Sequence, residues 1–259
     1  MSGDRHKGRG SRVPTPPVWL ARTLVVVCFL ALLEAAVRGG LVSKFFVPPP
    51  SEFLAQVARD LVNWQFLVYT GITLYETGVA FMLALAIGVA FGFLLWRVKP
   101  LGEAYDPLVA GLFSSPIVLL YPIFLVVFGR TPLAIIALAS LFGVLPIILF
   151  TRQALAGVSP ILLRVGASLN LSRWANFRYI MLPAAAPTIF TGLRIGLTYI
   201  LIVVVAMEFV LQIGGLGNLV SETSLMFRAD ELYSGVTLVV LMSAAFIFLI
   251  YRAEGMVRR

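Results

Sequence analysis

Four polar side chains interrupt long apolar runs of the sequence. Their charged or hydroxyl groups could contact a solute. Glu208 interrupts the run Val203–Val210, Arg194 and Tyr199 precede it in the same apolar stretch, and Glu76 lies near the start of an earlier stretch. An ionisable group in such surroundings is costly and usually faces a cavity or a partner. We therefore treat these four residues as candidates for lining a solute pathway. The alternatives are a structural hydrogen bond for Glu208, a position reaching the polar surface for Arg194, and a helix contact for Glu76. Tyr199 can equally be ordinary packing.

The residue types that most catalytic centres need are scarce. The sequence has one cysteine, Cys28, and one histidine, His6. These counts exclude an intramolecular disulfide, a Cys/His zinc cluster and a Cys–His catalytic pair. No Gly-x-x-x-x-Gly-Lys-Ser/Thr loop for nucleotide phosphates occurs, so energy from ATP must come from another chain. An intramembrane enzyme is therefore disfavoured, and we expect neither a catalytic residue nor a metal site.

The composition indicates an integral membrane protein. Apolar residues make up 60% of the 259 residues and charged residues 12%, with a mean hydropathy of +0.97. Ordinary soluble domains carry about 45–50% apolar and about 25% charged residues. A soluble core of this length cannot bury that excess. The net charge of +8 fits loops rich in lysine and arginine on the cytoplasmic side of a membrane better than nucleic-acid binding.

The apolar runs predict an all-α polytopic membrane protein with six transmembrane helices. Crossing a roughly 30 Å core takes about 20 apolar residues in a helix. The six predicted spans are about Trp19–Val37, Thr70–Trp96, Leu108–Phe128, Leu133–Phe150, Pro187–Leu211 and Ser234–Tyr251. Pro116 and Pro122 in the third span are tolerated when neighbouring helices satisfy the freed carbonyls. The first span follows a basic tail and can also be read as a signal peptide, but no clear small-x-small cleavage site follows it.

Lysine and arginine residues set the predicted orientation. With both termini in the cytoplasm, 13 of them lie on the cytoplasmic side and 5 on the other, which satisfies the positive-inside rule. We expect the bacterial cytoplasmic (inner) membrane as the location. The predicted organisation is a disordered basic tail at 1–18, a first helix with a periplasmic segment at 19–69, a transmembrane domain at 70–251 with a cytoplasmic loop at 151–186, and a basic cytoplasmic C-terminus at 252–259.

Shorter patterns predict local structure outside and between the spans. Ser51 follows three prolines and could cap a short amphipathic helix on the outer surface. Its apolar face would hold Phe53, Leu54, Val57 and Leu61. Two Gly-x-x-x-Gly ladders, starting at Gly88 and Gly192, predict close helix packing. The glycines at 214, 215 and 217 predict a tight turn at the outer end of the fifth span.

The cytoplasmic loop at 151–186 is the most informative segment. Ser159-Pro160 is typical of a helix start, and Asn170 can end that helix in a left-handed conformation. Ser172 could cap a second helix, Arg173–Met181, which we expect Pro183 and Pro187 to stop before the fifth span. The loop carries too many apolar residues for a solvated segment. A protein partner is favoured slightly over a helix pair lying on lipid.

This loop resembles the signature loop of ATP-binding-cassette (ABC) importer permeases. The family pattern is Glu-Ala-Ala, three residues, Gly, nine residues, Ile, one residue, Leu-Pro. Anchored on Ile180, Leu182 and Pro183, it places Arg164-Val165-Gly166 at Glu-Ala-Ala and Asn170 at the glycine. Surrounding residues are similar to the nitrate, sulfonate and taurine branch. They are Ser172-Arg173-Trp174, Leu182-Pro183-Ala184-Ala185-Ala186-Pro187, Thr191-Gly192-Leu193-Arg194, Pro49-Pro50-Ser51-Glu52, Thr73-Leu74, Phe128-Gly129 and Gly215-Leu216-Gly217.

The resemblance covers about residues 45–220 and implies a mechanism. A permease of this family pairs with a second copy, and each loop docks into an ABC ATPase subunit that binds ATP. A periplasmic substrate-binding protein delivers the solute, and small anions are the branch's main theme. The permease itself binds no cofactor. Two departures matter: Arg164 reverses the charge of the family's glutamate, and Asn170 replaces its glycine. The partner either carries compensating acids or couples more weakly.

The alternative from a different class is a stand-alone secondary transporter of a small solute. Such transporters usually show inverted repeats and broken helices. No convincing internal repeat occurs in this sequence, and the long helix pair at 151–186 would have no purpose.

Overall fold

Helices alone build the described part of this chain. A computed structural model describes residues 18–113 and 119–257, and no strand occurs among them. Nearly all of the predicted basic tail therefore lies outside the described residues. In chain order the elements are α1 (Val18–Arg38), α2 (Pro50–Asp60), α3 (Trp64–Arg97), α4 (Lys99–Phe113), α5 (Tyr121–Phe128), α6 (Pro132–Ala156), α7 (Pro160–Ser168), α8 (Arg173–Asn176), the π-helical turn η2 (Phe177–Met181), α9 (Leu182–Leu211), α10 (Gly215–Leu225) and α11 (Ala229–Val257).

Four described helices are long and apolar enough to cross a membrane. They are α3, α6, the continuous helix Arg173–Leu211 that includes α9, and α11. They match the second, fourth, fifth and sixth predicted spans, and α1 occupies the first. The all-α membrane fold is confirmed, whereas the count of six transmembrane helices is not.

The third predicted span, Leu108–Phe128, is not one helix. α4 ends at Phe113 and α5 begins only at Tyr121. Their 15 and 8 residues rise about 22 Å and 12 Å at 1.5 Å per residue, less than the roughly 30 Å apolar core. Pro122 stands in the first turn of α5, where a missing N–H costs nothing. Pro116 lies outside the described residues. Proline therefore begins a new helix here, where we expected a tolerated kink.

α6 is the central helix, and glycines allow its neighbours to approach it. Its most apolar window is 72% buried, against 22–44% for the other three candidate spans. A Cβ added at Gly92 of α3 would lie 2.6 Å from Cβ of Thr151. On α9, a Cβ at Gly196 would lie 2.8 Å from the carbonyl oxygen of Gly143 in α6. Both glycine ladders thus serve helix packing, as predicted.

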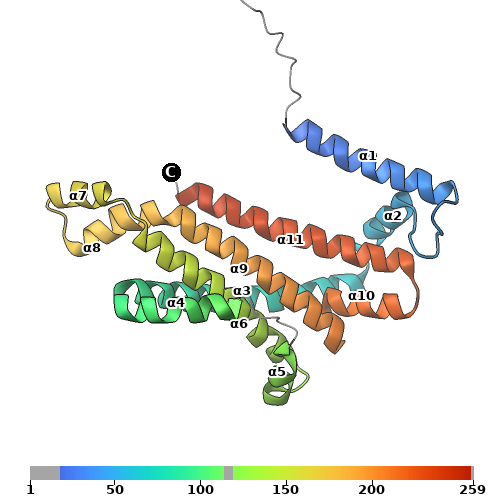
Figure 1. Ribbon diagram of the computed structural model, residues 1–259. Coiled ribbons are helices and arrows are strands. Elements are labelled where there is room, and N and C mark those ends of the chain that lie inside the picture. The colour runs from blue at the N-terminus through green and yellow to red at the C-terminus, as the bar shows by residue number, and fades with distance from the viewer. Residues whose placement is uncertain (1–17, 114–118, 258–259) are drawn as a thin grey trace, which may run out of the picture.

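The two ends of the helix bundle carry different elements. Figure 1 shows α7 and α8 at one end, near the C-terminal end of α11, and α2 and α10 at the opposite end. We call these the loop end and the α10 end. At the α10 end, Asp60 of α2 is 2% exposed and accepts hydrogen bonds from Ser234 (2.5 Å) and Gln56 (2.8 Å). This buried contact fixes α2 on α11.

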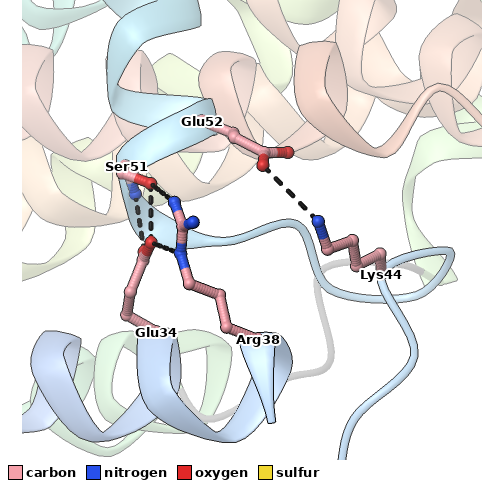
Figure 2. A network of polar contacts seen from close by, with 5 residues as sticks. All are labelled: Glu34, Arg38, Lys44, Ser51 and Glu52. Atoms are coloured by element: carbon pink, nitrogen blue, oxygen red, sulfur yellow. Dashed lines mark hydrogen bonds and ion pairs between the residues drawn. The ribbon is translucent and has the colours of Figure 1, made fainter. Parts of the chain in front are cut away.

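A polar network joins α1 to α2 (Figure 2). The carboxylate of Glu34 accepts hydrogen bonds from the Ser51 amide (2.9 Å), the Ser51 hydroxyl (2.7 Å) and Arg38 (2.5 Å). Ser51 therefore does not cap α2 as predicted. Pro49 occupies the N-cap position, because the helix begins two residues earlier than expected and Pro50 suits its first position.

Candidate functional site

The predicted loop forms two short helices joined by a tight turn. The Ser159 side chain accepts a hydrogen bond from the Ile161 amide (3.3 Å) at the start of α7. The Ser172 side chain accepts one from the Ala175 amide (3.2 Å) at the start of α8. Both predicted caps are therefore confirmed, since each serine satisfies an amide that has no partner within its helix.

Asn170 ends α7 in the left-handed conformation that its position predicted, with φ of 51°. The Asn170 amide donates to the Ala167 carbonyl (3.0 Å), and the Leu171 amide donates to the Gly166 carbonyl (3.1 Å). These two bonds form the Schellman arrangement that satisfies the last carbonyls of a helix. Asparagine is among the few residues other than glycine that adopt this conformation routinely, which explains how it replaces the family's glycine.

Gly166 is the contact point between the two arms of the loop. It is buried, and a Cβ on it would overlap Oδ1 of Asn176 and lie 2.9 Å from Cδ1 of Ile180. The fold thus brings together Gly166 and Ile180, two of the residues aligned with the family signature. Arg164 and Val165 are exposed, so this part of the signature faces outward from the helix pair.

The second arm continues into α9 without a break, which corrects our expectation that Pro183 and Pro187 stop it. The π-helical turn η2 precedes Leu182, whose amide donates to the carbonyl of Phe177 five residues back. A wider turn relieves the clash of a proline ring with the carbonyl four residues before it. Further along, the Thr191 hydroxyl donates to the Pro187 carbonyl (3.0 Å). The loop is therefore joined to α9 as one continuous helix.

The helix pair presents an exposed apolar and basic surface, which we call the loop surface. Its large apolar members are 64–70% exposed: Ile161, Leu169, Trp174 and Tyr179. Arg164, Arg173 and Arg178 are also exposed. Trp174 stacks on Phe177 with ring centroids 5.9 Å apart, and Phe177 meets Phe93 of α3 edge-on at 5.5 Å. The surface is thus anchored to the bundle by an aromatic cluster.

Glu208 lies in a buried hydrogen-bonded cluster at the α10 end. It is 0% exposed and accepts hydrogen bonds from the Thr73 hydroxyl (2.7 Å) and the Gly217 amide (2.8 Å). Thr73 in turn accepts one from the Leu216 amide (2.8 Å). Both amides belong to the first turn of α10. The Glu208 carboxylate satisfies the Gly217 amide and the Thr73 hydroxyl satisfies the Leu216 amide, and a carboxylate here suits the positive end of the helix dipole. Glycine is required at 215, where a Cβ would overlap the Glu208 carboxyl.

Glu76 joins Glu208 from the neighbouring helix. It is 1% exposed, and its carboxyl interacts electrostatically with that of Glu208. Neither oxygen of Glu76 has a hydrogen-bond partner among the described residues. The fold therefore places two of the four predicted pathway residues side by side, 132 positions apart in the sequence.

The other two predicted pathway residues lie elsewhere. Arg194 forms an ion pair with Glu254 of α11, donates to Thr191 (3.0 Å) and lies 4.5 Å from the ring centroid of Tyr251. These contacts tie α9 to α11 near the loop end, and they give Arg194 a structural role. Tyr199 lies on α9 and is half-buried. Pathway lining by these residues stays a prediction.

Three side chains that hold helices together were missed by sequence reasoning. Thr73 was noted only for its resemblance, yet it connects Glu208 to α10. Glu254 was overlooked, although an acid near the end of an apolar helix signals a buried partner. Arg130 also caps α9 by donating to the carbonyl of Leu211 (2.6 Å), and no local pattern marks this contact because 81 residues separate the two.

The fold is similar to that of chains in solved ABC transporters. The chain superposes on the membrane subunit of an inward-facing MetNI methionine ABC transporter with a TM-score of 0.63 and 22% identity, covering 76% of this chain and 97% of that one. An amino acid ABC transporter solved with histidines gives 0.55 and 17%, covering 80% and 97%. These likenesses show the fold.

Sequence comparison shows the family. Residues 81–259 match the family described as binding-protein-dependent transport system inner membrane component, and the chain belongs to it. It is 25% identical to the taurine transport system permease protein TauC of Escherichia coli over 78% of this chain and 76% of that one. It is 32% identical to the nitrate import permease protein NrtB of Synechocystis over 56% and 52%. Such proteins are transport permeases and not enzymes, and this chain is a permease component of a binding-protein-dependent ABC importer.

Proposed function

We propose that the chain forms the membrane pathway for a small anionic solute and is driven by a separate ATPase subunit docked on the loop surface. Support for the solute class comes from the relatives, which are named for taurine, aliphatic sulfonates and nitrate. A periplasmic binding protein would deliver the solute at the α10 end, and a second copy of the permease would complete the pathway. ATP would be used by the partner, and this chain would bind no cofactor.

The loop surface is the observation that carries this proposal. Four large apolar side chains stand more than 60% exposed on two short helices, although small residues or polar groups would suffice for a connecting loop. Because η2 continues into α9, a displacement of the docked loop would be transmitted directly to the pathway helix. We propose Arg164, Val165, Gly166, Asn170, Ile180, Leu182 and Pro183 as the residues that shape this coupling element.

The charge of the loop surface defines the partner it fits. Arg164, Arg173 and Arg178 are exposed around Trp174, so the ATPase cleft should carry acidic side chains around an apolar pocket. An acidic cleft of this kind would also compensate for the reversed charge at Arg164. The basic surface supports a cytoplasmic position for the loop end, and we propose that both termini lie on the same side.

Co-purification tests the docking directly. The detergent-solubilised full chain would be purified with the ABC ATPase encoded next to its gene. Trp174→Ala is compared with Trp64→Ala, because both tryptophans are at least 70% exposed but Trp64 begins α3 at the α10 end. We expect Trp174→Ala to lose most of the ATPase and Trp64→Ala to retain it. Removing a buried aromatic anchor typically costs about 2 kcal/mol or more, a loss of roughly thirtyfold in affinity.

The charge prediction uses a second variant. Because the partner is expected to carry acids there, Arg164→Glu should reduce ATPase retention, and increased retention would contradict the proposed charge match. Equal retention by the wild type and both tryptophan variants would refute docking on the loop surface.

A further inference from the structure

Two buried acids are not used by the proposed coupling to an ATPase. Glu76 of α3 and Glu208 of α9 are 1% and 0% exposed. Among the described residues, their carboxyls interact with each other, with the Thr73 hydroxyl and with the Gly217 amide, and no lysine or arginine is among these groups. A buried charge without a counter-charge is strongly unfavourable. The pair therefore needs a bound cation of some kind.

The two carboxyls differ in their hydrogen bonds. Both oxygens of Glu208 are used, one by Thr73 and the other by the Gly217 amide. Neither oxygen of Glu76 has a partner. A carboxylate can only accept hydrogen bonds, whereas a carboxylic acid can also donate one. Glu76 lies beside the Glu208 carboxylate, and no donor satisfies its own two oxygens. A carboxyl in these surroundings is favoured in its protonated form, because it can then donate to the neighbouring carboxylate.

We propose that Glu76 and Glu208 together bind one proton, carried by Glu76 and shared with Glu208, and that this proton holds the first turn of α10 against α3 and α9. A divalent cation is disfavoured, because Ca²⁺ and Mg²⁺ take about six or more oxygen ligands. Only the two oxygens of Glu76 are not already engaged.

Other charged and titratable side chains on the surrounding helices make contacts away from the acidic pair. Arg130, before α6, donates to the carbonyls of Leu211 and Gln212. Glu222 of α10 and Glu231 of α11 line a separate polar pocket of about 180 Å³ with Asp60. Tyr69 of α3 contacts Gln65, and Tyr121 of α5 packs on the apolar core. Among the residues that the structure describes, no positive charge therefore acts on the acidic pair in place of the proton.

Losing the proton would release α10. Two adjacent carboxylates repel each other when water is excluded. Glu208 relieves that repulsion by moving away from Glu76, and it then leaves the Gly217 amide and the Thr73 hydroxyl that holds the Leu216 amide. The glycines at 214 and 215, with φ of 132° and 84°, give this turn the freedom to open. The site thus links proton binding to the position of α10.

Infrared difference spectroscopy on the full chain in lipid nanodiscs tests the proton directly. The C=O stretch of a protonated carboxyl is resolved from that of a carboxylate. We expect the wild type to show a protonated, buried carboxyl at neutral pH, and Glu76→Gln to lose that band. Glu222→Gln, on an α10 residue outside the pair, is the matched control and should retain it. A band that is absent from the wild type, or unchanged in Glu76→Gln, overturns the proposal.

Amide hydrogen exchange tests the link to α10. After correction for intrinsic exchange, raising the pH should speed exchange of the Leu216 and Gly217 amides by roughly tenfold or more in the wild type, the loss expected for a hydrogen bond to a charged group. Glu76→Gln should stay protected at every pH, because a glutamine amide donates to Glu208 without titrating. Replacing choline chloride by sodium chloride should change nothing. Protection that depends on sodium, or that is pH-independent in the wild type, overturns the proposal.

Discussion

Replacing Gly92 by alanine is expected to force α3 away from α6. The added Cβ would lie 2.6 Å from Cβ of Thr151 and 2.8 Å from the Ile148 carbonyl oxygen. Carbon atoms in contact prefer about 3.5–4.0 Å, so the helices must separate locally by about 1 Å. Neither neighbouring atom can rotate away, because one is a backbone atom and the other is bonded directly to the backbone. Overpacking of this kind costs about 1–3 kcal/mol.

The same helix supplies the control. A Cβ at Gly78 of α3 meets nothing within 4 Å. Gly78→Ala should therefore gain up to about 1 kcal/mol of helix propensity without a packing penalty. The two alanine variants should differ by about 2–4 kcal/mol in the free energy of unfolding.

Unfolding by sodium dodecyl sulfate in mixed micelles, followed by circular dichroism, measures this difference. Gly92→Ala should unfold at a lower detergent fraction than the wild type, and Gly78→Ala at an equal or higher one. If the two variants unfold together, close packing at Gly92 does not stabilise the bundle and our account of the glycine ladder is refuted.

Three further predictions concern polar contacts. Thr73→Val should destabilise the chain by about 2–4 kcal/mol in the same unfolding assay, because two hydrogen bonds are lost, whereas Thr77→Val should be neutral or stabilising, since that buried hydroxyl has no partner. Asn170→Val should speed amide exchange at the end of α7 relative to Asn170→Gly, because a β-branched residue resists the left-handed conformation at φ of 51°; equal exchange would contradict this. Arg194→Gln and Glu254→Gln should each destabilise the chain, and the double variant should lose less stability than the sum of the two single losses, by about 1–3 kcal/mol. Additive effects would show that the ion pair does not stabilise the fold.

Local signals predicted the loop and its turn well. The caps at Ser159 and Ser172 and the left-handed Asn170 are governed by residues within three or four positions. Such contacts depend on side-chain chemistry next to the backbone amides they satisfy, and the sequence shows that chemistry directly.

Proline effects were predicted less well. Pro183 and Pro187 were expected to stop a helix, yet the chain runs on through them, and a π-helical turn just before Leu182 accommodates Pro183. Near Pro122 we expected one continuous span, whereas the structure has two separate helices. Proline lacks a backbone N–H in each case, and its surroundings decide whether the helix continues or a new one begins.

The sequence by itself determined that this is a helical membrane protein, that most of its spans lie where they do, and which loop could dock a partner. Apolar length, charge bias and short-range caps carry that information. Only the tertiary structure decided the partners of the polar groups. Glu76 meets Glu208, and Arg194 meets Glu254, because helix packing around α6 brings together residues that are far apart in the chain. Which face of a helix meets which neighbour is set by side-chain volume across several helices at once.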